Sequence, residues 1–92
     1  MDYPVIRRRV VVRGRVQGVG FRWSTRTCAD ALGVTGFARN LVDGAVAVEV
    51  EGPEPAVRTM VEWLREGPPS ARVSEIEITE RDPEGSAAFT IA

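Results

Sequence analysis

Residues 14–22 read Gly-Arg-Val-Gln-Gly-Val-Gly-Phe-Arg, in which a glycine-spaced loop separates a strand pattern from a helix pattern. Residues 5–14 are rich in β-branched side chains and end in glycine, which predicts a first strand. The residues after the loop repeat at the spacing of one helix face, at Phe21, Thr25, Cys28 and Leu32. Gly33 follows where a glycine commonly ends a helix. The loop at residues 15–21 therefore connects an expected first strand to an expected first helix.

The predicted first strand has two unlike faces, because side chains alternate along a strand. One face carries the apolar residues Ile6, Val10 and Val12, and the other carries Arg7, Arg9 and Arg13. We expect the arginine face to lie on the open, solvated side of the sheet. A nucleic-acid contact is the alternative for the arginine run at residues 7–9, and it is weaker because no aromatic residue interleaves with the run.

Alternation and turn residues predict the other strands. They are expected at residues 34–40, 45–51 and 73–81, with a short closing strand at Phe89 and Ile91. Asp43-Gly44 is typical of a hairpin turn, and residues 82–85 predict a further turn.

A second helix is expected between the strands at residues 45–51 and 73–81. Proline and acid at residues 52–55 suit its first turn, and Gly-Pro-Pro at residues 67–69 ends it. Its buried face carries Val57, Met60, Val61 and Leu64. The resulting order, β-α-β-β-α-β plus a short terminal strand, is the ferredoxin-like, split βαβ arrangement of the α+β class. We expect two helices on one face of a mostly antiparallel four-stranded sheet, plus the short C-terminal strand.

Composition excludes several classes of function. Ninety-two residues make one domain and not two, so residues 1–92 are expected to form a single unit. The chain has no histidine and no lysine, which excludes a Ser-His-Asp triad, Schiff-base chemistry and a lysine-bearing phosphate loop. With one cysteine and no histidine, the ligands of an ordinary zinc site are missing as well. Chemistry in this chain must rely on arginine, carboxylates, amides, hydroxyls and the backbone.

The same composition bears on location. The single cysteine, Cys28, allows no internal disulfide and favours a reducing compartment. Its place on the apolar helix face predicts packing in the core, not nucleophilic attack. No apolar run approaches the length of a membrane span, and the first residues lack the pattern of a signal peptide. We expect a cytoplasmic protein that binds no membrane.

Charge is distributed unevenly along the chain. Residues 1–39 hold eight arginines and two acids, a net of +6, whereas residues 40–92 hold four arginines and eleven acids, a net of −7. This asymmetry suggests an anion-binding region in the first half. The alternative is that the two halves of the sequence are not two halves in space, and charge alone does not decide between these interpretations.

The glycine-spaced loop has the features of a phosphate cradle. Its glycines allow backbone N–H groups to turn inward, and consecutive inward amides bind anions. The helix that follows adds free amides and the positive end of its dipole. Arg22, at the start of that helix, offers a planar fork that can bind two phosphoryl oxygens together. A glycine-rich turn alone is weak evidence, and the arginine strengthens it.

The string at residues 14–22, taken together with residues 32–40, closely resembles the acylphosphatase family. The resemblance spans nearly the whole chain, continuing through Asp43-Gly44, Glu51-Gly52-Pro53, Trp63-Leu64 and Gly67-Pro68. It implies a ferredoxin-like fold and the hydrolysis of acyl phosphates to a carboxylate and inorganic phosphate, without metal or cofactor. Two departures occur: Phe37 stands where the family often has tryptophan, and residues 89–92 lack the basic-aromatic end of many members.

The resemblance also assigns the site. The family's catalytic pair, an arginine and an asparagine, corresponds to Arg22 and Asn40. Strands one and two run parallel in a split βαβ unit, so their C-terminal ends meet at one edge and these two residues can converge. We expect Asn40 to orient the attacking water. The residues expected to bind the substrate phosphate are Val16, Gln17, Gly18, Val19, Gly20, Phe21 and Arg22.

The expected partner is a small-molecule acyl phosphate, with inorganic phosphate or sulfate as a competing anion. We expect a monomer that binds no nucleic acid. Two alternatives are a non-catalytic module that binds an anion or RNA, and a carbamoyl-phosphate-handling domain cut from a larger maturation protein. The self-contained start and end of the chain weigh against the second alternative. Trp63 is expected at or near the core, whereas Trp23 either partly covers the site or lies on the surface.

Overall fold

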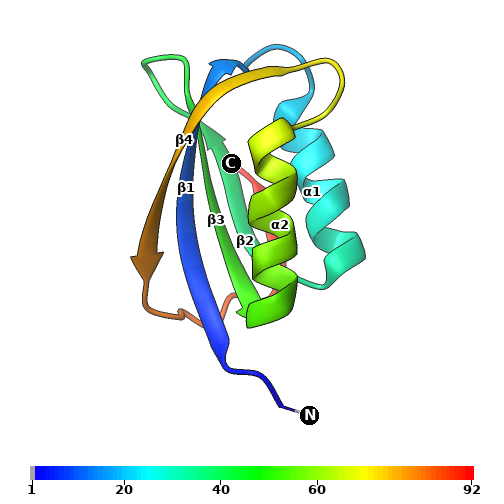
Figure 1. Ribbon diagram of the computed structural model, residues 1–92, viewed down its shortest axis with the longest axis vertical. Coiled ribbons are helices and arrows are strands. Elements are labelled where there is room, and N and C mark those ends of the chain that lie inside the picture. Colours follow the sequence, from blue (N-terminus) through cyan, green and yellow to red (C-terminus); the bar gives the residue numbers. More distant parts are fainter. Residues whose placement is uncertain (1) are drawn as a thin grey trace.

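The computed structural model describes residues 2–92 as two helices packed against one face of a five-stranded sheet (Figure 1). The elements are β1 (Val5–Arg15), α1 (Phe21–Leu32), β2 (Thr35–Asn40), β3 (Val46–Pro53), α2 (Glu54–Glu66), β4 (Arg72–Arg81) and β5 (Phe89–Ile91). The predicted ferredoxin-like order is confirmed, and each predicted strand and helix is present with ends that agree within two residues.

The sheet differs in one respect from the expected mostly antiparallel four-stranded sheet with a short C-terminal strand. The strand order is β4-β1-β3-β2-β5, and β5 is an integral edge strand that pairs parallel to β2. β1 and β2 both pair antiparallel with β3, so they run parallel to each other with β3 between them. Their C-terminal ends therefore lie at the same end of the sheet.

The main core lies between the sheet and the two helices. α2 contributes its predicted face, Val57, Met60, Val61 and Leu64. α1 buries Phe21, Thr25 and Ala29, and it ends at Gly33, which caps it in the left-handed conformation as predicted. Cys28 is only half-buried and, like Leu32, packs against the edge of this core, so the buried face of α1 is rotated from the predicted one. Trp63 also packs at the core edge.

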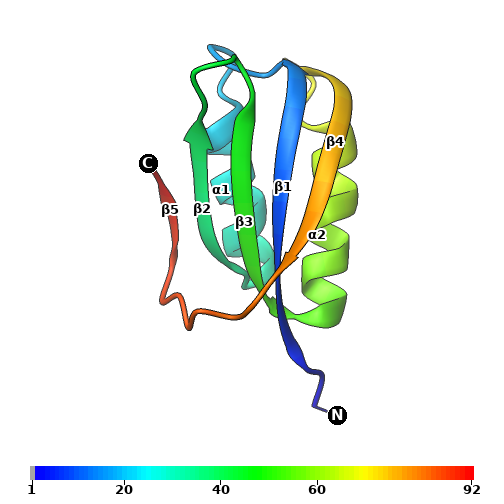
Figure 2. The same cartoon turned by 90° about the vertical axis from the view of Figure 1, so that its left-hand side faces the viewer.

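The opposite face of the sheet, predicted to be open, is covered at one end only (Figure 2). Because β4 and β5 lie at opposite edges of the sheet, the chain between them must cross it, and residues 82–88 do so over the face away from the helices (Figure 2). We call residues 82–88 the crossover segment. The turn predicted at residues 82–85 is wrong, since this stretch forms an irregular connection.

The crossover segment covers Arg7, which is 2% exposed, so the prediction of a solvated side chain is wrong for this arginine. The Nε of Arg7 donates to Glu49 Oε1 at 2.7 Å, and Nη1 donates to Glu51 Oε1 at 3.1 Å. Nη1 also donates to Ser86 Oγ of the crossover segment at 2.8 Å. Glu49 and Glu51 are likewise buried. Arginine can lie buried here because carboxylates and a hydroxyl satisfy its donors.

Glu51 fastens the crossover segment to the sheet. Its Oε1 accepts the backbone N–H of Glu84 at 2.6 Å, and its Oε2 accepts that of Gly85 at 2.9 Å. Burial alone would raise the pKa of Glu51, but these hydrogen bonds and the one from Arg7 lower that pKa below its ordinary value. We call Arg7, Glu49, Glu51 and Ser86 the clasp.

Candidate active site

The loop between β1 and α1 has the backbone that its glycines predict. Gly18 and Gly20 have φ angles of 75° and 76°, in the left-handed region that strains any residue with a Cβ. Gly20 directly precedes α1, and no side chain caps that helix end. Among the described residues, no backbone acceptor takes the amide N–H of Gly18 or Gly20. These amides are free to bind an anion at the positive end of α1.

Gln17 holds this loop against the turn between β2 and β3. Its side-chain Nε2 donates to the carbonyl oxygens of Leu41 at 2.8 Å and Ala45 at 2.9 Å. Leu41 directly follows the last residue of β2. The hydrogen bonds of Gln17 therefore keep the loop beside the end of β2, where Asn40 stands.

Asn40 reaches the loop because of its register in β2. Gly36 and Ala38 are buried toward the helices, and a strand period of two places Asn40 on the same face. Arg39 lies on the other face, with its guanidinium carbon 5.4 Å from the centre of the Phe37 ring. The side chain of Asn40 is thus on the side of the sheet where α1 begins.

Arg22 and Asn40 line one cavity of about 160 Å³. Its wall consists of Val16, Gly18, Gly20, Phe21, Arg22, Trp23, Asn40 and Ile91. The structure thus brings together six of the eight predicted site residues. Gln17 and Val19 are not part of the wall, because the Gln17 amide is held by the turn after β2 and Val19 packs against the core edge.

β5 completes the cavity and contacts Arg22 directly. The Nη1 of Arg22 donates to the carbonyl oxygen of Ala92 at 3.0 Å. Ala92 in turn donates its backbone N–H to Ala38 in β2 at 2.9 Å. Sequence reasoning did not place Ile91 or Ala92 at the site. The apolar pair Phe89 and Ile91 signalled a closing strand, but only the crossover puts that strand beside β2 and α1.

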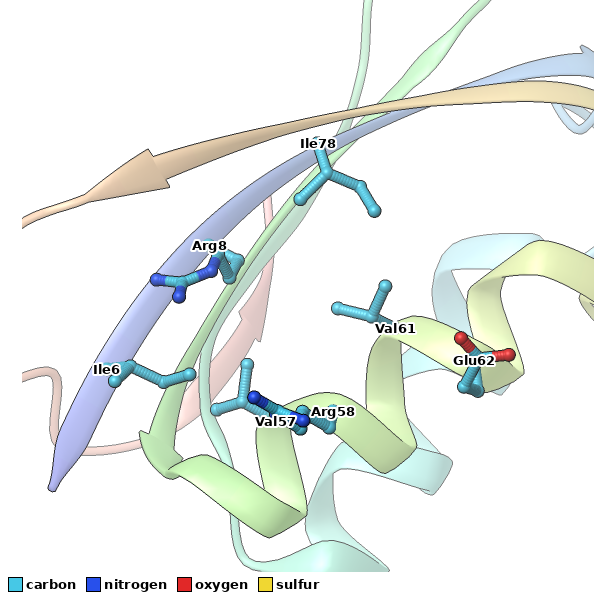
Figure 3. A pocket seen from close by; sticks show the side chains of 7 residues that line it. All are labelled: Ile6, Arg8, Val57, Arg58, Val61, Glu62 and Ile78. Atoms are coloured by element: carbon cyan, nitrogen blue, oxygen red, sulfur yellow. The ribbon is translucent and has the colours of Figure 1, made fainter. Parts of the chain in front are cut away.

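A larger groove of about 470 Å³ lies elsewhere, between α2 and the strands β1 and β4 (Figure 3). It is lined by Ile6, Arg8, Val57, Arg58, Val61, Glu62 and Ile78. Both arginines have carboxylate partners, Arg8 with Glu80 and Arg58 with Glu54, each at 3.3 Å. The groove offers neither free amides nor an unengaged charge, so the smaller cavity is the better candidate for chemistry.

The described residues contain no cluster of three or more histidine, cysteine, aspartate or glutamate residues that could hold a metal ion. Neither helix of this part of the chain is long and apolar enough to cross a membrane.

Comparison with known proteins agrees with the geometry. The family model described as acylphosphatase matches residues 8–91. The chain belongs to the acylphosphatase family. It is 51% identical to an acylphosphatase of Anaeromyxobacter dehalogenans over 87 residues, which cover 94% of each chain. It is 47% identical to one of Nostoc sp. over 87 residues, covering 95% of this chain and 86% of the relative. These relatives indicate a hydrolase that acts on acyl phosphates.

Solved acylphosphatase structures share the fold. The crystal structure of acylphosphatase from Bacillus subtilis superposes with a TM-score of 0.90 at 41% identity, covering 95% of this chain and 98% of that one. A similar unit also occurs inside a longer protein. Full-length HypF, in its phosphate- and nucleotide-bound form, matches with a TM-score of 0.88 at 26% identity, but this chain covers only 12% of it. Unlike HypF, the Bacillus subtilis acylphosphatase is matched over nearly its full length.

Proposed function

We propose that this acylphosphatase hydrolyses the carboxyl–phosphate bond of acyl phosphates in the cavity between the loop at residues 16–20 and the end of β2. The observation that carries the proposal is the shared cavity of Arg22 and Asn40, beside the free amides of Gly18 and Gly20. An anion-binding loop, a fork-shaped cation and a neutral amide meet there, which are the groups that a phosphoryl transfer needs.

The phosphoryl group binds to the loop amides and Arg22. One nitrogen of the guanidinium is engaged with Ala92, which fixes the plane of the fork near the loop. The other donors of Arg22 remain for two phosphoryl oxygens. The helix dipole of α1 adds positive potential at the same place. These groups stabilise the charge on the equatorial oxygens of the transition state.

Asn40 positions the attacking water. Its side-chain carbonyl accepts a hydrogen bond from the water, and its NH₂ group donates to the phosphoryl group. The water oxygen forms a bond to phosphorus as the bond from phosphorus to the acyl oxygen breaks, and the electron pair leaves on the carboxylate. The water proton passes to the phosphate. A carboxylate leaving group is a weak base with a conjugate-acid pKa of about 4 to 5, so no general acid is needed.

The proposal also covers the need for a metal, the competing anions, the location of the protein and its oligomeric state. Arg22 and the amides carry the positive charge that a metal would otherwise supply, so the reaction runs without metal. Inorganic phosphate or sulfate competes with substrate for the same loop. Cys28 is a free thiol, consistent with a cytoplasmic protein, and we propose that the protein acts there as a monomer.

Release of phosphate from acetyl phosphate tests the proposal. We expect release well above spontaneous hydrolysis, an unchanged rate in the presence of EDTA, and inhibition by inorganic phosphate. Arg65→Ala is a matched control, because Arg65 lies on α2 outside the cavity, is half-exposed and forms an ion pair with Glu62. It should keep the parent rate, whereas Arg22→Ala should lose it. Failure to release phosphate above the spontaneous rate would refute the proposed activity, and a loss of rate with EDTA would refute metal independence.

A further inference from the structure

The outer edge of β4 is unpaired. β4 lies at one end of the strand order, so β1 pairs with only one of its two edges (Figure 2). In the described part of the chain, residues 72–81 form no backbone hydrogen bond outside the sheet. The N–H and C=O groups of alternate residues therefore point away from β1 without a backbone partner. With ten residues, β4 is long for an edge strand, because native proteins commonly keep such strands short.

Three hollows follow β4 along its length. The groove of about 470 Å³ described above includes Ile78 in its wall. A hollow of about 190 Å³ is lined by residues 73–76 together with Arg65 of α2, and a hollow of about 430 Å³ is lined by Arg8 and residues 80–82. An extended chain laid beside β4 would pass all three hollows.

The side of β4 that faces the helices is apolar. Ile76 and Ile78 pair with Val12 and Val10, which belong to the core under the helices, so both isoleucines point to that side. α2 does not cover Ile78, which is 43% exposed although it is a large apolar residue. Ile78 and Val61 point into the groove from opposite sides (Figure 3). Apolar side chains of an added strand would fill this space and leave water.

The other side of β4 is acidic. Residues 75–80 hold three glutamates and no arginine, and Glu75 and Glu77 point away from the helices because side chains alternate along a strand. The Oε1 of Glu77 lies 3.8 Å from Nε of Arg13, yet 61% of the Glu77 side chain is exposed. Charged residues on an edge hinder pairing with a strand of like charge, and a second copy of β4 carries the same acids. A strand with basic residues at these positions complements the edge.

We propose that β4 is a docking edge for an extended segment of a partner protein in which apolar and basic residues alternate. The segment adds a strand to the sheet through backbone hydrogen bonds. Its apolar side chains enter the groove beside Ile78, and its arginine or lysine side chains lie beside Glu75 and Glu77. No residue of β4 lines the cavity that holds Arg22 and Asn40, so docking does not depend on hydrolysis.

Three short capped peptides test the edge of the parent protein by calorimetry. The probe alternates valine and arginine, a second peptide has glutamate in place of arginine, and a third is the probe with every backbone amide methylated. We expect the probe to bind about tenfold more tightly than the glutamate peptide, because several opposite-charge pairs become like-charge pairs. The methylated peptide should not bind, because it cannot donate to a strand edge.

The peptide series decides the proposal without any change to the protein. Absence of binding by the probe would overturn it. Equal affinity for the arginine and glutamate peptides would remove the charge complementarity, and binding of the methylated peptide would exclude strand addition. A dimer of the parent protein that the probe dissociates, as seen by sedimentation, would make a second copy the occupant and overturn the proposal as well.

Two charge reversals locate the bound probe. Glu77 and Asp30 are matched, because each side chain is 61% exposed and lies 3.8 or 3.9 Å from one arginine. We expect Glu77→Arg to weaken binding of the probe by about three- to tenfold, and Asp30→Arg, on α1, to change it less than about twofold. Glu77→Gln, which adds no repulsion with Arg13, should give a smaller loss in the same direction. Equal effects at Glu77 and Asp30 would place the peptide elsewhere and overturn the proposal.

Discussion

Arg22 combines a structural contact with a binding role. Its bond to the Ala92 carbonyl uses one nitrogen and keeps the guanidinium at the cavity wall. Lysine could replace the positive charge but not the planar fork, because its ammonium is a point charge. We expect Arg22→Lys to lower kcat/KM for acetyl phosphate on the order of 10²-fold, by analogy with the loss of one positioned transition-state donor. The melting temperature should change little. Turnover close to that of the parent would show that no fork is needed.

Gly36 lets β2 pack closely against β3 because it has no side chain. Its φ is 133°, and a Cβ there would lie 1.9 Å from the carbonyl oxygen of Glu49 in the neighbouring strand. We expect Gly36→Ala to lower the free energy of unfolding by more than about 1 kcal/mol, as measured by urea denaturation. Gly44→Ala is the matched control, because Gly44 also has a positive φ but no atom within 4 Å of the added carbon. An equal loss in both variants would mean that the close approach to Glu49 is unimportant.

At the scale of elements, the crossover segment depends on ionised carboxylates. Burial would raise the pKa values of Glu49 and Glu51, but hydrogen bonds from Arg7 and other donors lower both below the ordinary value. A carboxyl whose pKa is lower in the folded state stabilises the fold above its unfolded pKa, about 4.3, and loses that contribution as pH falls through the folded pKa. The clasp should therefore be intact at pH 7 and weaken progressively in acid below about pH 5.

Glu51→Gln tests this account of the clasp. The amide keeps the size of the side chain but removes the charge that Arg7 and the two backbone N–H groups require. We expect a loss of about 3 kcal/mol in the free energy of unfolding at pH 7, the scale seen when one partner of a buried ion pair is removed. The loss should shrink as pH falls, because the parent then becomes protonated at the same position. The same loss at pH 7 and in acid would contradict a role for the Glu51 charge.

At the scale of the whole molecule, ion pairs between neighbouring strands of the sheet balance much of the uneven charge along the sequence. β1 is arginine-rich and lies between β3 and β4, which carry many of the acids. Arg8 pairs with Glu80 across one boundary, and Arg9 pairs with Glu49 across the other. The interpretation that sequence halves are not spatial halves therefore accounts for the β1 arginines. Arg22 is different, because its guanidinium donates to a neutral carbonyl.

Binding of an anion to the loop should stabilise the whole fold. A ligand that binds only the folded state adds about 2.7 kcal/mol when its concentration is 100 times Kd. We expect inorganic phosphate to raise the melting temperature of the parent and of the Arg65→Ala control, but not that of Arg22→Ala. Equal stabilisation of all three proteins would place the anion elsewhere.

Features that depend on residues close together in the sequence could be predicted, whereas features that depend on contacts between residues far apart in the sequence could not. Strands and helices depend on local periodicity, so they could be predicted. The family resemblance implied the pair of Arg22 and Asn40, and the parallel course of the first two strands allowed these residues to converge. The burial of Arg7 and the place of Ala92 depend on where the crossover segment runs, which links residues far apart in the chain. No local pattern distinguishes an arginine under such a segment from one in water.

The central claim is that Asn40 positions the water while Arg22 and the loop hold the phosphoryl group. It is tested most directly by measuring kcat for acetyl phosphate and Kd for inorganic phosphate in Asn40→Ala beside the parent. A group that acts mainly in the transition state affects rate more than binding. We expect kcat to fall by about 10²- to 10³-fold with Kd changed less than about threefold. Parent-like turnover, with phosphate bound equally well, would contradict the account.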